Sequence, residues 1–111
     1  MLTLPVPPST NNLFVNVRGR GRRKSDEYRA WLHEAGLKLN LQRPQPVSGP
    51  VHVTIRIPDI ARGDLDNRIK ASLDLLVKHR LIEDDSMVAS IHVSRYGGAE
   101  MQVEVRPGRA E

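Results

Sequence analysis

Alternation of apolar and polar residues with a period of two marks several segments of this chain as strands. The pattern is clearest over residues 51–57, where valine and isoleucine alternate with polar residues until Pro58. Residues 101–106 repeat it, and 88–96 follow it less cleanly. Residues 2–6 also alternate, and their proline suits an edge strand because proline cannot donate to a strand ladder. These segments predict four strands.

Helical spacing of apolar residues marks two further segments. The first predicted helix begins after Ser25, a favourable N-cap. It should end before Arg43-Pro44, because the residue before a proline resists the helical conformation. The second begins near Asp66, and its predicted buried stripe consists of Ile69, Leu73, Leu76 and Val77.

The resulting order is β-α-β-α-β-β, which predicts an α+β fold with one mixed sheet and two helices packed on one face. Gly97-Gly98 predicts a hairpin turn between the last two strands. The segment at about 14–24 is rich in glycine and arginine without periodicity, which predicts a mobile basic loop. A length of 111 residues favours a single domain over 1–111.

Composition narrows the classes of protein. The chain has no cysteine, which excludes disulfides and thiolate metal sites and fits a reducing cytoplasm. Its apolar runs are short and its start lacks the pattern of a signal peptide, so neither a membrane partner nor secretion is expected. A formal charge of +4 and a pI near 10 point towards an anionic partner.

The distribution of charge says more than its sum. Residues 18–24 carry five bases, which form a candidate DNA clamp: Arg18, Arg20, Arg22, Arg23 and Lys24. The same loop could instead have only non-specific affinity. Residues 59–85 hold seven acids against five bases. A metalloenzyme that cuts a polyanion needs separate basic and acidic regions, because the basic region attracts phosphate and a cation neutralises the acidic region.

The acids form two clusters that could hold a metal ion. Asp64 and Asp66 stand between a predicted strand and a predicted helix, and Asp84-Asp85 precede the next strand. Mg²⁺ takes oxygen ligands, usually one or two carboxylates together with water and phosphate. Asp66 alone could be a helix cap, or the acids could form a solvated turn. Because clustered like charges are costly without a cation, a metal site is favoured.

Lys70 follows Asp66 by one helical turn. It could form an ion pair with Asp66, or it could stand beside the scissile phosphate and offset charge in the transition state. Asp74 follows Lys70 by four residues and is interpreted as its structural partner rather than as a metal ligand.

The series Asp64-Leu65-Asp66-Asn67, Lys70, Asp74 and Asp84-Asp85 resembles the signature of the RusA family of Holliday junction resolvases. The opening Leu4-Pro5-x-Pro7-Pro8-Ser9-x-Asn11-Asn12 is similar to that family's opening. The resemblance implies a homodimeric, Mg²⁺-dependent endodeoxyribonuclease of four-way DNA junctions, active in recombination and repair without an organic cofactor. It implies bacterial or phage origin, and Asp64, Asp66 and Asp85 as essential carboxylates with Asp84 beside them. It also implies that Lys70 is the important basic residue, with a catalytic and a DNA-binding role.

The sequence leaves open whether the two acid clusters meet within one chain. A helix over 66–78 is about 20 Å long, and the six residues from Lys78 to Asp84 reach back at most about 20 Å. The acid clusters therefore meet within one chain only if that segment runs straight back, or they meet across a dimer. Two other functions also stay open: a non-catalytic nucleic-acid-binding module, and a nuclease that prefers forks or flaps.

Overall fold

The computed structural model describes residues 1–8, 14–19, 21–63 and 65–108. Two residues of the predicted site, Arg20 and Asp64, lie outside these ranges. Within the ranges the elements follow in this order: β1 (Leu2–Leu4), β2 (Phe14–Val17), β3 (Gly21–Lys24), α1 (Asp26–Leu41), β4 (Val51–Pro58), α2 (Leu65–Lys78), the 3₁₀ helix η2 (Asp85–Met87), β5 (Val88–Tyr96) and β6 (Met101–Pro107).

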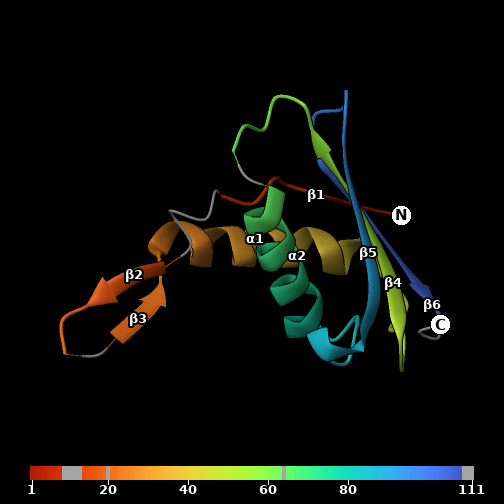
Figure 1. The fold of residues 1–111 in the computed structure, drawn as a ribbon, viewed down its shortest axis with the longest axis horizontal. Helices are drawn as coiled ribbons and strands as arrows, with labels where there is room; N and C mark the ends of the chain where they lie inside the picture. The colour runs from red at the N-terminus through yellow and green to blue at the C-terminus, as the bar shows by residue number, and fades with distance from the viewer. Residues whose placement is uncertain (9–13, 20, 64, 109–111) are drawn as a thin grey trace.

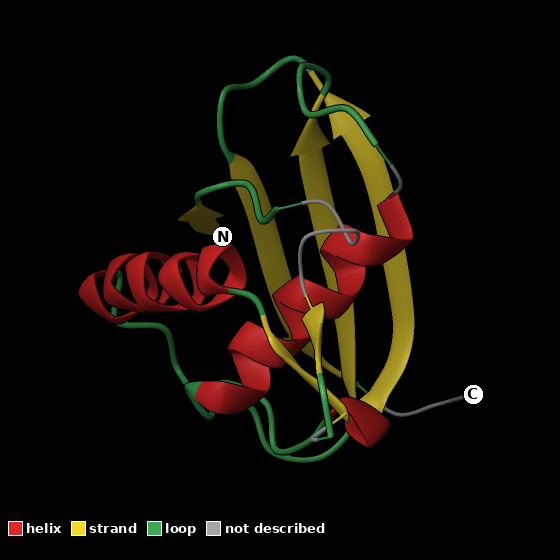
Figure 2. Ribbon diagram, turned by 90° about the vertical axis from the view of Figure 1, so that its left-hand side faces the viewer, coloured by secondary structure: helices red, strands yellow, loops and turns green. Residues whose placement is uncertain are grey.

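The predicted α+β fold is confirmed. Four strands form one mixed sheet in the order β1-β6-β4-β5, in which β4 and β5 are parallel and the other neighbours antiparallel. Both helices cover the same face of this sheet (Figure 1), and Figure 2 shows them in front of it. The alternating residues of β4 divide as predicted, because Val51, Val53, Ile55 and Ile57 are fully buried beneath the helices.

Helix α1 begins and ends where its sequence predicts. The Ser25 hydroxyl oxygen accepts the backbone N–H of Tyr28 at 3.0 Å, so Ser25 is the N-cap. The helix ends at Leu41, before Arg43-Pro44. Its buried face carries Tyr28 and Trp31, whose indole N–H donates to the carbonyl of Pro5 at 3.0 Å and so ties the helix to the chain after β1.

The predicted turn at Gly97-Gly98 is wrong as a hairpin. Strands β5 and β6 are not neighbours, because β4 lies between them. Since β5 runs parallel to β4, the chain must cross the end of β4 to add β6 on its other side. A Cβ atom on Gly98 would stand 2.2 Å from the Tyr96 ring, so this glycine permits close packing of the crossing segment.

The segment 14–24 was predicted as a loop, but its described residues form the two-stranded hairpin β2–β3. Phe14 pairs with Lys24 and Val17 pairs with Gly21. The hairpin extends away from the sheet, beyond the end of α1 (Figure 1). Its residues are mostly exposed, so they show no apolar alternation, which is why sequence periodicity missed it.

The buried stripe of α2 differs from the predicted one. Only Leu76 belongs to both sets, while Ile69, Leu73 and Val77 are partly buried at the margin of the core. The fully covered face consists of Arg68, Ala71, Ser72, Leu75 and Leu76. Small residues at the centre of this face let the helix approach the sheet closely. A search for helical periodicity among large apolar side chains does not detect such small residues.

Candidate active site

Asp66 lies at the start of α2. It is exposed in the first turn of a helix that begins at Leu65, so it is not the N-cap that one interpretation of the sequence suggested. Among the described residues it takes part in no ion pair. A carboxylate in this position is stabilised by the positive end of the helix dipole and remains open to solvent.

Asp84 and Asp85 lie beyond the other end of α2. Asp84 is the N-cap of η2, and its carboxylate accepts the backbone N–H of Ser86 at 3.2 Å and the Ser86 hydroxyl at 2.5 Å. The Ser86 side-chain hydrogen bond, followed by the backbone one, lowers the pKa of the Asp84 carboxyl below its ordinary value. Asp84 is therefore held as an anion, and Asp85 stands next to it on the surface.

Asp66 does not meet the Asp84-Asp85 pair within one chain. Helix α2 separates Asp66 from Lys78 by about 18 Å at 1.5 Å per residue. The chain then turns rather than running straight back, because the backbone N–H of Leu81 donates to the carbonyl of Leu76 at 2.9 Å. Over the described ranges, no three histidine, aspartate or glutamate residues gather closely enough to hold a metal ion. Of the two arrangements left open by the sequence, the local one is not formed by Asp66 and Asp84-Asp85.

A cavity of about 530 Å³ opens beside the second cluster. Its lining brings the hairpin, both helices and the acid pair together: Lys24, Leu32, Asp74, Val77, Lys78, Asp84 and Asp85. Lys24 closes the hairpin at its base, where it pairs with Phe14. The structure thus places a base of the predicted DNA clamp at the rim of the same hollow as two candidate metal ligands.

Lys70 contacts the hairpin rather than an acid. Within the described part of the chain it has no ion pair with Asp66 or Asp74, so neither expected pairing forms. Its ammonium nitrogen lies 5.8 Å from the centroid of the Phe14 ring, and the guanidinium carbon of Arg22 lies 4.8 Å from the same centroid. Phe14 therefore holds two cations near each other, one from α2 and one from β3.

Asp74 has a structural partner, but the partner is Tyr28. The Tyr28 hydroxyl donates to the Asp74 carboxylate at 2.6 Å and joins α1 to α2. Burial, and then the hydrogen bond to Asp74, raises the pKa of the Tyr28 phenol well above its ordinary value. The predicted pairing with Lys70 is wrong because the tyrosine reaches Asp74 from the neighbouring helix.

The other clamp residues lie on or beside the hairpin. Arg18 is exposed in its turn, and Arg22 and Arg23 are exposed on β3. Arg23 lies 3.6 Å from the carboxylate of Asp26 in an exposed pair that costs little to break. The described bases of the clamp are therefore exposed and can reach a phosphate backbone.

Two arginines near the start of α2 were not identified as notable from the sequence. Arg95 on β5 donates to the carbonyls of Ala61 at 2.6 Å and Gly63 at 3.0 Å, and so holds the segment that leads to α2. Arg68 on α2 is only 6% exposed, and its Nε and Nη1 have no hydrogen-bond partner. Burial, and then the nearby Arg95, lowers the pKa of Arg68. Single charged residues within regular elements carry no pattern that sequence analysis detects.

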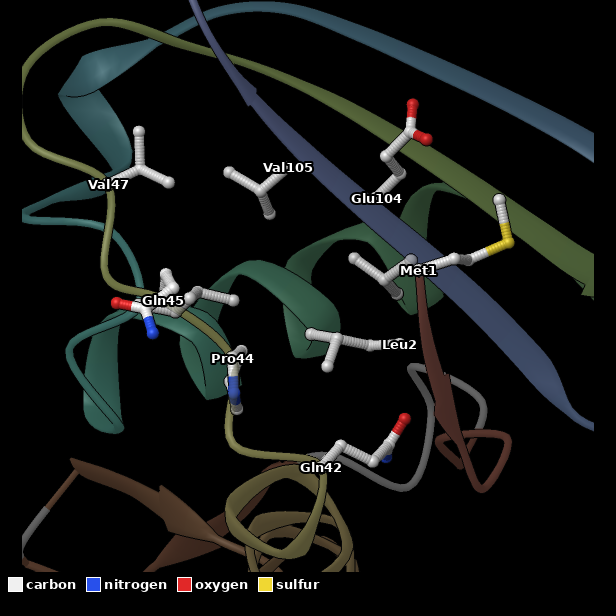
Figure 3. A pocket seen from close by; sticks show the side chains of 10 residues that line it. Met1, Leu2, Gln42, Pro44, Gln45, Val47, Glu104 and Val105 are labelled. Atoms are coloured by element: carbon white, nitrogen blue, oxygen red, sulfur yellow. The ribbon is translucent and has the colours of Figure 1, made fainter.

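A second hollow is lined by residues of β1, β6 and the segment after α1 (Figure 3). Most of its lining is aliphatic or uncharged, and Glu104 is its one charged residue. The Gln42 side chain bonds the backbone N–H and carbonyl of Thr3 here, each at 2.8 Å. None of the described residues that line this hollow has a basic side chain that could bind a phosphate.

The family described as endodeoxyribonuclease RusA matches residues 5–106. The crossover junction endodeoxyribonuclease RusA of Escherichia coli K12 is 34% identical over 98 residues, which cover 83% of this chain and 78% of the relative. The proteins of that name from Shigella sonnei and from Enterobacteria phage 82 match with the same identity and coverage. A mixed sheet with exposed acids beside a basic hairpin suits a nuclease. The chain belongs to the RusA family of endodeoxyribonucleases.

Proposed function

We propose that this chain is a homodimeric endodeoxyribonuclease that resolves four-way DNA junctions by metal-assisted hydrolysis of phosphodiester bonds. The observation that carries the proposal is the meeting of Lys24 with Asp84 and Asp85 around one cavity. The names of the relatives, which describe endonucleases of crossover junctions, support the choice of substrate. The enzyme acts in the cytoplasm of a bacterium or of a phage-infected cell.

The exposed acids fit a divalent cation, and Mg²⁺ is the proposed one. Asp66, Asp84 and Asp85 offer only hard oxygen ligands, and none of the three is neutralised by an ion pair in the described chain. Asp64 is proposed as a further ligand from its place in the motif. When bound, Mg²⁺ would polarise the phosphate and supply an activated water.

The protein's own residues bind and orient the DNA. Arg18, Arg22 and Arg23 are proposed to bind phosphates along the hairpin, as are Arg20 and Lys24. Lys70 is proposed to stabilise the charge that develops on the scissile phosphate. The contact of Lys70 with the Phe14 ring supports this role. It places the ammonium group beside the basic hairpin, and the charge of the ammonium is not neutralised by an acid within the described residues.

Cleavage of four-way, forked and plain duplex DNA, compared with Mg²⁺ and with a chelator, tests the proposal. We expect paired cuts in the four-way substrate with Mg²⁺ and no cut with the chelator. Preference for forks would show the alternative nuclease, and binding without any cut would show a binding module. Asp66→Asn and Asp85→Asn should each abolish cutting, and wild-type rates in either variant would refute the site.

A further inference from the structure

Helix α1 carries an exposed apolar patch that takes no part in the core. Leu37 and Leu41, which are one helical turn apart, are 55% and 81% exposed. The buried face of α1 consists of other residues, among them Trp31 and Leu39. Single exposed apolar side chains are ordinary on a protein surface, but neighbouring ones in a hollow are typical of a binding site.

The patch lies in a groove between α1 and the end of α2, here named the helix groove. Two adjoining hollows of about 460 and 160 Å³ form it, and Leu37 and Asn40 line both of them. The larger hollow reaches Arg43, just beyond α1, and the smaller one reaches Lys78 and His79 at the end of α2. The helix groove therefore extends from one helix to the other.

Close packing of the two helices forms the floor of the helix groove. A Cβ atom on Gly36 would stand 2.3 Å from Nε2 of His79, so this glycine permits the imidazole ring to lie directly against α1. The backbone N–H of His79 donates to the carbonyl of Leu75 at 3.1 Å, which fixes this residue at the end of α2. A groove that is already formed binds a ligand with little cost of reorganisation.

The charges that line the helix groove have one sign. They belong to Arg29, Arg43 and Lys78, and none of the described residues that line the groove is acidic. Arg29 contacts the carboxylate of Asp26 in an exposed ion pair, which solvent screens strongly. Glu34, on the same helix, lines neither hollow. The groove therefore offers positive charge around an apolar patch.

Arg43 has an unusual backbone conformation for an arginine. Its φ is 51°, in the left-handed region, and it directly follows Gln42, the C-cap of α1. Glycine is the usual residue after a C-cap, because its missing Cβ removes the strain of this conformation. An arginine here is less favourable for the fold than a glycine. This observation is independent of the hollows and indicates a use for the guanidinium at the rim of the groove.

Nucleic acid and a second copy of the chain both fit the helix groove poorly. Single-stranded DNA binds by stacking its bases on aromatic rings, and no described lining residue is a phenylalanine, tyrosine or tryptophan. Duplex DNA presents phosphates, which leave the two leucines uncovered. Two copies that met through this groove would set the bases of one against the bases of the other. Charge complementarity favours an acidic ligand that also has large apolar side chains.

We propose that the helix groove binds an acidic peptide segment of a partner protein. Large apolar side chains of the segment pack on Leu37 and Leu41, and its carboxylates pair with Arg43 and Lys78. Leu32 and Lys78 line both this groove and the cavity beside the acid pair, so the bound partner stands next to the nuclease site. The inference adds a protein partner to the proposed function and does not depend on the junction activity.

Nuclear magnetic resonance of the ¹⁵N-labelled protein tests the groove without DNA or metal. The probe is a short peptide that alternates aspartate with leucine, and its controls have asparagine for aspartate or alanine for leucine. We expect the probe to shift the amide signals of residues 36–43 and 78–79, and each control to shift them far less. Equal shifts with the alanine control would show charge attraction alone, and either that result or the absence of shifts at these residues would overturn the proposal.

A pair of serine substitutions tests the apolar contact. Leu37→Ser with Leu41→Ser should weaken binding of the probe by about tenfold or more, because apolar area is no longer buried against the peptide. Ile60→Ser is the control, since Ile60 is 77% exposed and does not line the groove. Wild-type affinity in the leucine variant would refute the proposed site.

The charged contacts have their own matched test. Arg43→Gln with Lys78→Gln should weaken binding of the probe and flatten its dependence on salt. Lys38→Gln with Arg106→Gln removes the same charge from exposed ion pairs outside the groove and should have a much smaller effect. Equal losses in the two variants would show that net charge alone attracts the peptide, which contradicts a defined site.

The same spectra distinguish the other occupants. Duplex DNA should shift the signals of the β2–β3 hairpin and leave those of residues 36–43 in place, and dilution of the protein alone should also leave them in place. Shifts of residues 36–43 with DNA would assign the groove to nucleic acid, and shifts on dilution would assign it to a second copy. Either result would overturn the proposal of a peptide partner.

Discussion

The hydroxyl of Tyr28 and the carboxylate of Asp74 are joined by a hydrogen bond of 2.6 Å that links the two helices. Asp74 also lines the cavity that contains Asp84 and Asp85. The bond therefore fixes the spacing of α1 and α2 and engages the Asp74 carboxylate between the helices, whereas Asp84 and Asp85 remain exposed to solvent.

Replacing Tyr28 by phenylalanine should lower the free energy of unfolding by about 1–2 kcal/mol, because Asp74 loses its donor in a partly buried place. Urea denaturation followed by circular dichroism measures the change. Tyr96→Phe is the control, since the Tyr96 hydroxyl donates to the carbonyl of Glu100 at an exposed position and should cost less. Equal losses in the two variants would contradict the special role of the Tyr28 bond.

Substitution of Phe14 by leucine should slow cleavage, because the aromatic face that holds Lys70 and Arg22 is lost while an apolar side chain remains. Lys70→Ala should slow it more, by about 10²-fold or greater, if the ammonium stabilises the transition state. Single-turnover cleavage of a four-way junction measures both effects. Lys38→Ala, far from the hairpin on α1, should cut at the wild-type rate.

Neutralising the hairpin should flatten the salt dependence of DNA binding. Each phosphate contact that is lost lowers the slope of log K against log salt by about 0.9, so Arg22→Gln with Arg23→Gln should lower it by about 2. Fluorescence anisotropy with a junction at several salt concentrations gives the slope. The matched control is Arg43→Gln with Arg106→Gln, and a slope unchanged in the hairpin variant would remove the hairpin from the DNA interface.

Arg95 should matter for catalysis more than for affinity. Arg95→Met keeps the length of the side chain but loses its bonds to the carbonyls of Ala61 and Gly63, which hold the approach to α2. We expect a fall in the rate of cutting at saturating enzyme, with a much smaller change in junction affinity. A variant with loss of affinity alone would show that Arg95 contacts DNA instead.

Stability should fall as the solution is acidified, through His79. Its Nε2 is buried without a partner, and burial, and then Lys78, lowers the pKa of the imidazole below 6.5. The unfolded chain therefore binds the proton more readily than the folded one. This contribution is present in full above the unfolded pKa and declines as the pH falls below about 6.5. Thermal melts from pH 7.5 to 5.5 should show a smaller decline in His79→Gln than in the wild type.

Sequence patterns correctly predicted those parts of the fold that depend on a single short segment. The alternation of β4 and the Ser25 cap of α1 each depend on residues close in sequence, and both predictions are confirmed. The hairpin predicted at Gly97-Gly98 is wrong because β4 lies between β5 and β6 in the sheet. A local turn signal contains no information about which strands become neighbours. The β2–β3 hairpin was not predicted because its exposed strands lack an apolar face.

The candidate site divides in the same way. The spacing of the acids along the chain singled out Asp66, Asp84 and Asp85, and all three are exposed in the structure. Their separation along α2 followed from helix geometry. The contact of Lys70 with Phe14 and that of Asp74 with Tyr28 join distant segments, so the preference for helical neighbours gave the wrong partners.

The position of β6 also has a consequence for folding. This last strand lies between β4 and β1, and Val103 pairs with Leu2 from the other end of the chain. Until β6 is in place, β1 has no strand to join and β4 has an open side, whereas the β4–α2–β5 unit can form from nearby residues. Contacts between such distant residues form slowly. Assembly of the nuclease should therefore proceed from a β4–α2–β5 nucleus to a late closing step, in which both ends of the chain become ordered together.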